Sequence, residues 1–180
     1  MRQPIAFDPF ARPEMFTELG VRPVGLEELL MKADFVSLHC PLNDQTRGLI
    51  GVDQFALMKP DAYLLNLARG GIVDEDALHD VLVKGRIAGA ALDCFAEEPV
   101  TKPHRFGAFD NVLLAPHCIA WTNELFRDIG RAGCQSILDL SEGRRPHGVV
   151  NPDVLDNPAF QEKWGRIRNR AISDSTELEA

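Results

Sequence analysis

The sequence predicts an α/β fold built around a doubly wound parallel sheet. Short apolar runs alternate with segments of helical periodicity, and from the second run onward they begin roughly 25 residues apart, the length of a strand plus a crossover helix. Within each run the apolar residues are consecutive, which is typical of strands covered on both faces. The runs are Pro4–Phe7, Asp34–His39, Tyr63–Ala68, Ile87–Asp93 and Asn111–Pro116.

The segments between and after the runs have helical spacing of apolar residues. Asp74 is a favourable N-cap for a helix over Glu75–Lys84, and Gly85 ends that helix. Beyond the alternating pattern, we expect one more short helix over Asp153–Arg168 and a polar tail over Ala171–Ala180. The other predicted helices are Gly25–Ala33, Gly51–Met58 and Asn123–Glu142.

Composition excludes several classes of protein. The 180 residues are 45% hydrophobic and 26% charged, close to the average for globular domains, which excludes an intrinsically disordered chain. The formal charge of −8 has the wrong sign for neutralising phosphates, so we expect no nucleic-acid partner. No apolar run approaches the ~20 residues that cross a bilayer, and no signal-peptide core is present. We therefore expect a cytoplasmic protein without a membrane partner.

The cysteines and histidines do not predict a metal site. Cys40, Cys94, Cys118 and Cys134 form no Cys-x-x-Cys pair, and no His-Glu-x-x-His is present. We expect reduced thiols and no metal.

Ionisable side chains follow most of the predicted strands. Asp8, Arg69, Asp93 and His117 come at or just after the ends of four runs, and His39-Cys40 ends the remaining one. Because ligands of such sheets bind beyond the carboxyl ends of the strands, these residues predict a functional site at one edge of the sheet.

Asp8 has two interpretations. An aspartate before a proline is common where a strand ends in a turn. Alternatively, its carboxylate accepts hydrogen bonds from both ribose hydroxyls of a dinucleotide and repels a 2′-phosphate, which favours NAD over NADP. Arg69 also has two interpretations. It is either a surface cation or a ligand of a substrate carboxylate, which its planar guanidinium suits. The second is favoured because Gly70 and Gly71 let the backbone pass close to a ligand.

Glu98 and His117 are more informative together than apart. One of Glu97 and Glu98 is expected to be solvated, and His117 alone also fits a packed core histidine. As a pair, the carboxylate would favour the protonated imidazole and fix which nitrogen carries the proton, as a general acid for carbonyl reduction requires. His39 is expected near the cleft. The other histidines, His79, His104 and His147, are expected at the surface.

Three ordered motifs resemble the D-isomer-specific 2-hydroxyacid dehydrogenases, a family that includes phosphoglycerate dehydrogenases and glyoxylate and hydroxypyruvate reductases. They are Leu65–Glu75, Ala88–Phe95 with Glu98-Pro99, and Asn111–His117, within a likeness that runs from about Ile5 to Pro152. The resemblance implies a Rossmann-type fold and NAD-dependent hydride transfer. The expected substrate is a D-2-hydroxyacid or 2-keto acid such as glycerate, hydroxypyruvate, glyoxylate or phosphoglycerate.

The resemblance also implies roles for individual residues. Arg69 would hold the substrate carboxylate and polarise the carbonyl, His117 would exchange the proton, and Glu98 would orient His117. Family members usually dimerise, so a homodimer is expected. The implied cofactor-binding residues are Asp8 for the ribose, Cys40, Leu67, Ala68 and Arg69, Asp93 for the carboxamide, and the backbone of His117, Cys118, Ile119 and Ala120.

One family feature is missing from the sequence. No Gly-x-Gly-x-x-Gly turn, which binds the pyrophosphate at a helix N-terminus, is present. The resemblance therefore implies an incomplete Rossmann-type sheet that lacks the first βα unit and most of the substrate domain. We expect a truncated gene product, the product of a misplaced start codon, or a cloned fragment, with weak NAD binding and low activity.

Residues 1–150 are expected to form the partial dinucleotide-binding domain, and residues 151–180 a helix and tail that would return to the substrate domain. The alternative is a non-enzymatic NAD(H)-sensing or dimer-partner paralogue.

Overall fold

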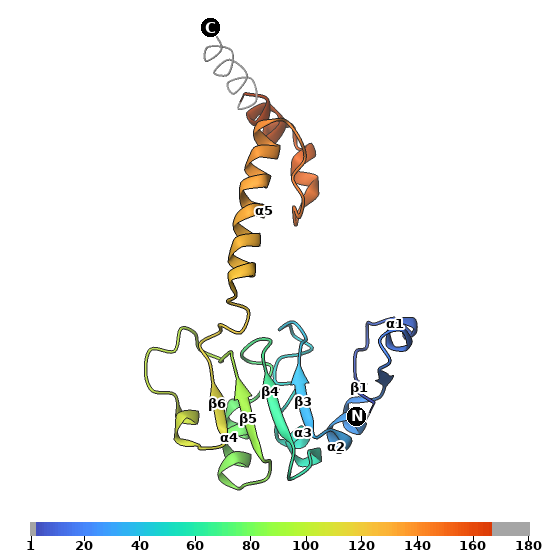
Figure 1. The fold of residues 1–180 in the computed structure, drawn as a ribbon, viewed down its shortest axis with the longest axis vertical. Coiled ribbons are helices and arrows are strands. Elements are labelled where there is room, and N and C mark those ends of the chain that lie inside the picture. The colour runs from blue at the N-terminus through green and yellow to red at the C-terminus, as the bar shows by residue number, and fades with distance from the viewer. Residues whose placement is uncertain (1–2, 167–180) are drawn as a thin grey trace. The chain divides into compact units, whose positions relative to one another are not determined.

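A computed structural model describes residues 3–166 of the chain (Figure 1). The chain divides into two compact units, residues 1–119 and 120–180, and each unit is described by itself. The predicted functional boundary near residue 150 stays a prediction.

Four of the predicted apolar runs form one parallel sheet in the first unit. Its order is β3-β4-β5-β6, so each strand lies beside the next strand along the chain. Val36 lies opposite Leu64, Leu64 opposite Ala90, and Ala90 opposite Val112. The register therefore brings the carboxyl ends of all four strands to one edge. The strands are β3 (Phe35–Leu38), β4 (Tyr63–Asn66), β5 (Gly89–Leu92) and β6 (Val112–Leu114).

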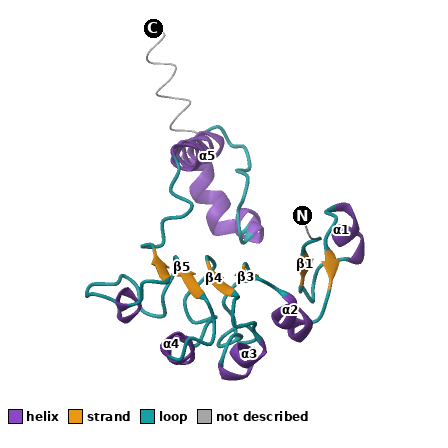
Figure 2. Ribbon diagram, turned by 60° about the horizontal axis from the view of Figure 1, so that its bottom comes forward, coloured by secondary structure: helices purple, strands orange, loops and turns teal. Residues whose placement is uncertain are grey.

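Three helices cover one face of this sheet (Figure 2). They are α2 (Leu26–Lys32), α3 (Val52–Leu57) and α4 (Glu75–Val83). Asp74 caps α4 as predicted, since its carboxylate accepts hydrogen bonds from the N–H groups of Asp76 and Ala77 at 2.9 and 3.0 Å. The core lies between helices and sheet, where each fully buried side chain contributes ~1.5–3 kcal/mol. Its largest members include Leu30, Phe55, Leu64, Leu78 and, from the 3₁₀ helix η1 (Arg105–Ala108), Phe106.

The opposite face of the sheet is not covered by a helix within residues 3–119 (Figure 2). Val36 is 2% exposed, whereas its neighbour Phe35 is 68% exposed, and Leu113 of β6 is 76% exposed. Consecutive apolar residues predicted strands covered on both faces. In this unit only one face is covered, although the apolar residues for a second layer are present.

The first apolar run does not join this sheet. It forms β1 (Ile5–Ala6), which pairs in parallel with β2 (Arg22–Pro23) across the short helix α1 (Pro13–Glu18). Neither α1 nor β2 was predicted. α1 has no buried residue, and β2 has only two residues, one of them proline, so neither carries a periodic apolar pattern.

The second unit is built around the long helix α5 (Asn123–Ser141), as predicted. Thr122 caps it, because its hydroxyl accepts the N–H of Leu125 at 3.1 Å. The predicted single helix over Asp153–Arg168 is wrong in its first part. A 3₁₀ helix, η2 (Pro152–Asp156), is followed by a separate helical stretch over residues 158–166, because the residue before Pro158 is disfavoured in the α conformation. Residues 167–168 and the predicted tail lie outside the described residues.

Within residues 3–166, no helix has the length and apolarity needed to cross a membrane.

Candidate active site

A carboxylate and an imidazole meet beyond the ends of β5 and β6. Nδ1 of His117 lies 2.8 Å from Oε2 of Glu98, and the N–H of Phe95 donates to the other oxygen, Oε1, at 2.8 Å. The pairing of Glu98 with His117 is the contact that the sequence predicted. With Nδ1–H donating to Glu98, Nε2 of His117 is the nitrogen left to exchange a proton.

The surroundings keep Glu98 ionised. Its pKa is lowered from the ordinary 4.5, first by the hydrogen bond with His117, then by the N–H of Phe95 and the charges of His117 and Arg69, while burial opposes this shift. An ionised carboxylate at this position stabilises a positive charge on the imidazole.

The loop that carries His117 is anchored by Asp93. The Asp93 side chain follows β5 and is buried, and its two oxygens accept hydrogen bonds from the N–H groups of Cys118 at 2.8 Å and Ile119 at 3.0 Å. His117 has a φ of 56°, in the left-handed region that non-glycine residues rarely adopt. Asp93 therefore positions this loop, a role that the sequence analysis missed. Its predicted contact with the carboxamide stays a prediction.

Arg69 lies on the loop that follows β4. A Cβ added to Gly70 would lie 1.7 Å from the carbonyl oxygen of Phe95, so only glycine lets this loop approach so closely. Buried Asn66 holds the loop by donating to the carbonyl of Arg69 at 3.0 Å and accepting the N–H of Ala68 at 3.3 Å. The Arg69 guanidinium donates to the carbonyl of Ala68 at 2.6 Å. The positive charge of Arg69 also helps to lower the pKa of Glu98. The contact of Arg69 with a substrate stays a prediction.

A cavity of about 690 Å³ adjoins the Glu98–His117 pair. Its wall includes Phe95, Val100, Leu114 and His104. The expectation that His104 is a surface residue is wrong, because its ring packs 4.7 Å from Phe95 and forms an ion pair with Glu75 at 3.6 Å. A small substrate beside the pair would therefore meet an apolar wall with one further imidazole.

Asp8 makes the contacts of a turn former. Oδ1 accepts hydrogen bonds from the N–H groups of Phe10 at 2.8 Å and Ala11 at 3.1 Å. This is the geometry of the first interpretation. The side chain is exposed and its second oxygen is not used in these two bonds, so the ribose contact stays a prediction.

The other predicted cofactor residues differ in position. Cys40, Leu67 and Cys118 are half-buried and Ala68 is buried in the first unit, whereas Ala120 begins the second unit.

Burial raises the pKa of the Cys40 thiol. Burial, followed by the charges of Glu98 and Asp93, raises the pKa of the nearby Cys94 thiol to about 11, which makes Cys94 a poor nucleophile. All four cysteines are free thiols. Within the described residues, no cluster of three or more His, Cys, Asp or Glu side chains is placed to hold a metal ion.

Comparison with known families decides what this domain is. The profile of the D-isomer specific 2-hydroxyacid dehydrogenase, NAD binding domain, matches residues 2–118. The chain belongs to this family. Its cofactor is NAD, and its fold is the Rossmann-like fold of this domain.

Relatives of this dehydrogenase domain agree in sequence and in structure. A glyoxylate reductase of Aeropyrum pernix is 42% identical over 142 residues, which cover 79% of this chain and 42% of the relative. A D-3-phosphoglycerate dehydrogenase of Methanocaldococcus jannaschii is 39% identical over 165 residues, which cover 91% of this chain and 30% of the relative. The NAD-complexed D-isomer specific 2-hydroxyacid dehydrogenase of Lactobacillus delbrueckii ssp. bulgaricus superposes with a TM-score of 0.74 at 34% identity. The superposition covers 82% of this chain and 48% of that structure's chain. The chain therefore spans less than half the length of these relatives.

Proposed function

We propose that this chain carries the proton-transfer groups of an enzyme that moves a hydride between NAD and a D-2-hydroxyacid or 2-keto acid. The observation that carries the proposal is the 2.8 Å contact between Nδ1 of His117 and Oε2 of Glu98 at the carboxyl edge of an NAD-binding sheet. Substrates such as glyoxylate, hydroxypyruvate, glycerate or phosphoglycerate fit the names of the relatives.

His117 acts as the general acid in carbonyl reduction and as the general base in the reverse direction. Before the transfer, the ionised Glu98 stabilises the positively charged ring of His117 through Nδ1. Nε2 then gives its proton to the carbonyl oxygen, which leaves a neutral ring whose Nδ1–H still donates to Glu98. A positioned proton relay of this kind contributes ~10²–10⁴-fold to the rate. Arg69 holds the substrate carboxylate, because a guanidinium offers two parallel N–H donors to a planar anion.

NAD supplies the hydride acceptor or donor of this reaction. The residues present fit part of the NAD molecule. The exposed carboxylate of Asp8 could accept hydrogen bonds from the ribose hydroxyls, and the carboxyl ends of the four strands lie at one edge of the sheet. The backbone of residues 67–69 and 117–120 would line the cofactor, with Cys40 and Asp93 beside it. A homodimer, a cytoplasmic location and the return of residues 151–180 to a substrate domain belong to the same proposal.

The proposal is tested in a hybrid enzyme. The present chain replaces the matching part of the Aeropyrum pernix glyoxylate reductase, and reduction of glyoxylate and hydroxypyruvate by NADH is measured. The hybrid should be active, and His117→Ala should lower kcat by ~10²-fold or more. His147→Ala, which changes an exposed histidine of the second unit, is the matched control and should leave kcat unchanged.

Two outcomes would contradict the proposal. A hybrid that binds NADH yet reduces no 2-keto acid in a panel would favour an NAD(H)-sensing or dimer-partner role. An active hybrid in which His117→Ala behaves like His147→Ala would remove His117 from the mechanism.

A further inference from the structure

Glu98 reaches the site on a short segment that follows β5, residues 95–98. The N–H of Phe95 donates to Oε1 of Glu98 at 2.8 Å. The carbonyl of Phe95 is constrained as well, because a Cβ added to Gly70 would lie 1.7 Å from its oxygen. The position of the Glu98 carboxylate therefore depends on how the peptide groups next to Phe95 are held.

Glu75 holds the next peptide group of this segment from α4. Its Oε1 accepts the N–H of Ala96 at 2.7 Å, across 21 residues of sequence. The consecutive N–H groups of Phe95 and Ala96 thus donate to two different carboxylates. Hydrogen bonds to an ionised acceptor are roughly twice as strong as those between neutral groups. Because α4 is capped by Asp74, Glu75 extends from a fixed first turn.

The second oxygen of Glu75 faces two basic side chains. Oε2 lies 3.6 Å from Nε2 of His104 and 3.9 Å from Nη2 of Arg105. Nδ1 of His104 accepts the N–H of Phe106 at 3.4 Å, so Nε2 is the nitrogen that carries a hydrogen toward Glu75. The Glu75 side chain is 17% exposed. These contacts fix the orientation of its carboxylate, with Oε1 directed at the segment of residues 95–98.

Helix capping does not account for this arrangement. Asp74 is the N-cap of α4, and its side chain accepts two N–H groups of the first turn. A negative charge near a helix N-terminus is favourable wherever it points, and the next residue, Asp76, provides one on an 89% exposed side chain. Glu75, in contrast, contacts the backbone of the segment that carries Glu98.

We infer that Glu75 is a positioning residue for Glu98. Its hydrogen bond with the N–H of Ala96 fixes the segment, so that Oε2 of Glu98 stays within reach of Nδ1 of His117. Glu75 acts on proton transfer through Glu98, and what it contributes is the reach of its side chain rather than its charge. The effect on catalysis rests on the proposed function, whereas the placement of Glu98 is measurable without turnover.

Two substitutions separate reach from charge. Glu75→Asp keeps the charge but shortens the side chain by one methylene group, which withdraws its oxygens from the N–H of Ala96. Glu75→Gln removes the charge but keeps an oxygen at the same distance along the side chain. The inference predicts that Glu75→Asp disturbs the site and that Glu75→Gln does not.

The first measurement is the pKa of Glu98 in the present chain, from the ¹³C chemical shift of its carboxyl carbon. This pKa is lowered first by the hydrogen bond with His117, then by the N–H of Phe95 and the charges of His117 and Arg69. Glu75→Asp should raise it toward the ordinary 4.5, because the segment loosens and these contacts weaken. Glu75→Gln should not raise it, because the loss of a nearby negative charge acts in the opposite direction.

The second measurement is the rate of the hybrid enzyme with glyoxylate and NADH. Glu75→Asp should lower kcat by about tenfold, less than the ~10²-fold that a ~1 Å misplacement of reacting groups can cost. KM for NADH should be unchanged, since residues 95–98 are not among the proposed cofactor contacts. Glu75→Gln should keep kcat within about twofold of the parent hybrid.

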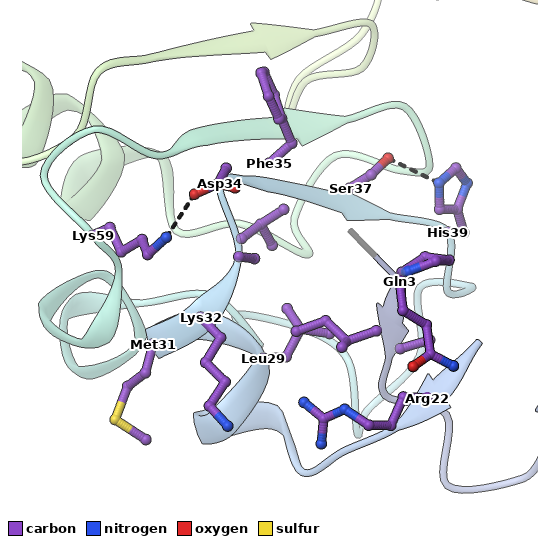
Figure 3. Close-up of a pocket in the computed structure, with 15 residues that line it drawn as sticks. Gln3, Arg22, Leu29, Met31, Lys32, Asp34, Phe35, Ser37, His39 and Lys59 are labelled. Carbon is purple, nitrogen blue, oxygen red and sulfur yellow. Dashed lines mark hydrogen bonds and ion pairs between the residues drawn. The ribbon is translucent and has the colours of Figure 1, made fainter. Parts of the chain in front are cut away.

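Two control variants change charge or stability elsewhere. Asp76→Asn removes a charge from the neighbouring residue of α4, whose carboxylate pairs with Arg105. Lys59→Gln breaks an ion pair with Asp34 at 2.6 Å, which lies where β3 begins, at the opposite edge of the sheet (Figure 3). Neither variant should raise the pKa of Glu98, and both should leave kcat unchanged.

Three results would overturn the inference. An unchanged pKa of Glu98 in Glu75→Asp would show that the segment needs no such support. A loss of activity in Glu75→Gln as large as in Glu75→Asp would assign the effect to charge. Equal losses in Glu75→Asp and Lys59→Gln would assign it to general stability. A hybrid that is inactive in every form would contradict the proposed function alone, since the pKa of Glu98 still decides whether Glu75 positions it.

Discussion

Glu98 is held by two donors of different kinds, and this decides how its charge depends on pH. The N–H of Phe95 is a fixed backbone group, whereas His117 is a titratable side chain. Both favour the ionised carboxylate over the protonated one. The folded protein therefore holds the Glu98 proton less tightly than the unfolded chain does.

This difference predicts a pH-dependent contribution to stability. Because the pKa of Glu98 is lowered in the folded state, its contribution is complete above the ordinary value of 4.5 and is lost as the pH falls through the lower, folded value. Glu98→Gln should lower the free energy of unfolding at pH 7 by less than about 1 kcal/mol, since both side chains are partly exposed. The difference from wild type should shrink as the pH falls below 4.5 and through the lower, folded value. Urea titrations from pH 7 to pH 3 measure it.

The exposed neighbour Glu97 provides the matched control. Glu97→Gln should change the free energy of unfolding little at any pH in the same range. A Glu98→Gln effect that stays the same size from pH 7 to pH 3 would show that the glutamate side chain contributes by packing rather than by its charge.

For single residues, the sequence predicted the titratable side chains of the site better than the residues that hold its loops in place. His117 was found because ionisable residues follow buried strands, which is a local pattern, and Glu98 was chosen over Glu97 through the family resemblance. The roles of Asp93 and Asn66 were missed. Asp93 accepts a hydrogen bond from the backbone of Cys118, 25 residues further along the chain. Asn66 donates to the carbonyl of Arg69 within a tight turn. Such contacts depend on how loops meet in space, which residue type alone does not specify.

The loop after β4 depends on a single close approach. Gly70 lies against the backbone of Phe95, so the loop that carries Arg69 and the loop that leads to Glu98 are in direct contact. The positions of the two side chains are coupled through this contact.

Gly70→Ala should therefore destabilise the fold and displace Arg69. Its Cβ would meet the Phe95 carbonyl oxygen at 1.7 Å, and backbone must move, at a cost of about 2 kcal/mol or more. Gly107→Ala is the control, because its Cβ would meet only the end of a Leu114 side chain at 4.0 Å, and it should change stability by no more than about 0.5 kcal/mol. Chemical denaturation of both variants measures the difference. Equal stability of the two would show that the loops separate at little cost.

Element prediction succeeded where apolar periodicity is strong. The main strands and α2 to α5 follow runs or stripes of apolar residues, and their positions were predicted to within a few residues. α1, β2 and the break before Pro158 were missed, because short, exposed or proline-interrupted elements are fixed by neighbours rather than by their own pattern.

At the scale of the whole molecule, the cofactor must bind against an unfavourable charge. The formal charge of the chain is −8, and the pyrophosphate of NAD is also negative. Enzymes of this fold offset such repulsion with backbone N–H groups of a glycine-rich turn at a helix N-terminus. These 180 residues contain no Gly-x-Gly-x-x-Gly. The predicted contacts of the strand ends with the ribose and nicotinamide portions would therefore act without the phosphate contacts of such a turn.

Titration of the present chain with NAD should accordingly give a Kd above about 100 μM, which corresponds to less than ~5.5 kcal/mol of binding free energy. The physical reason is that the predicted ribose and nicotinamide contacts would act without the contacts that a glycine-rich turn makes with the phosphates. Isothermal titration calorimetry measures the value, and the hybrid with the Aeropyrum pernix residues is the control, expected to bind at least tenfold more tightly. A low-micromolar Kd for the present chain would show that Asp8 and the strand-end loops suffice for the cofactor, and that the glycine-rich turn contributes little to affinity in this protein.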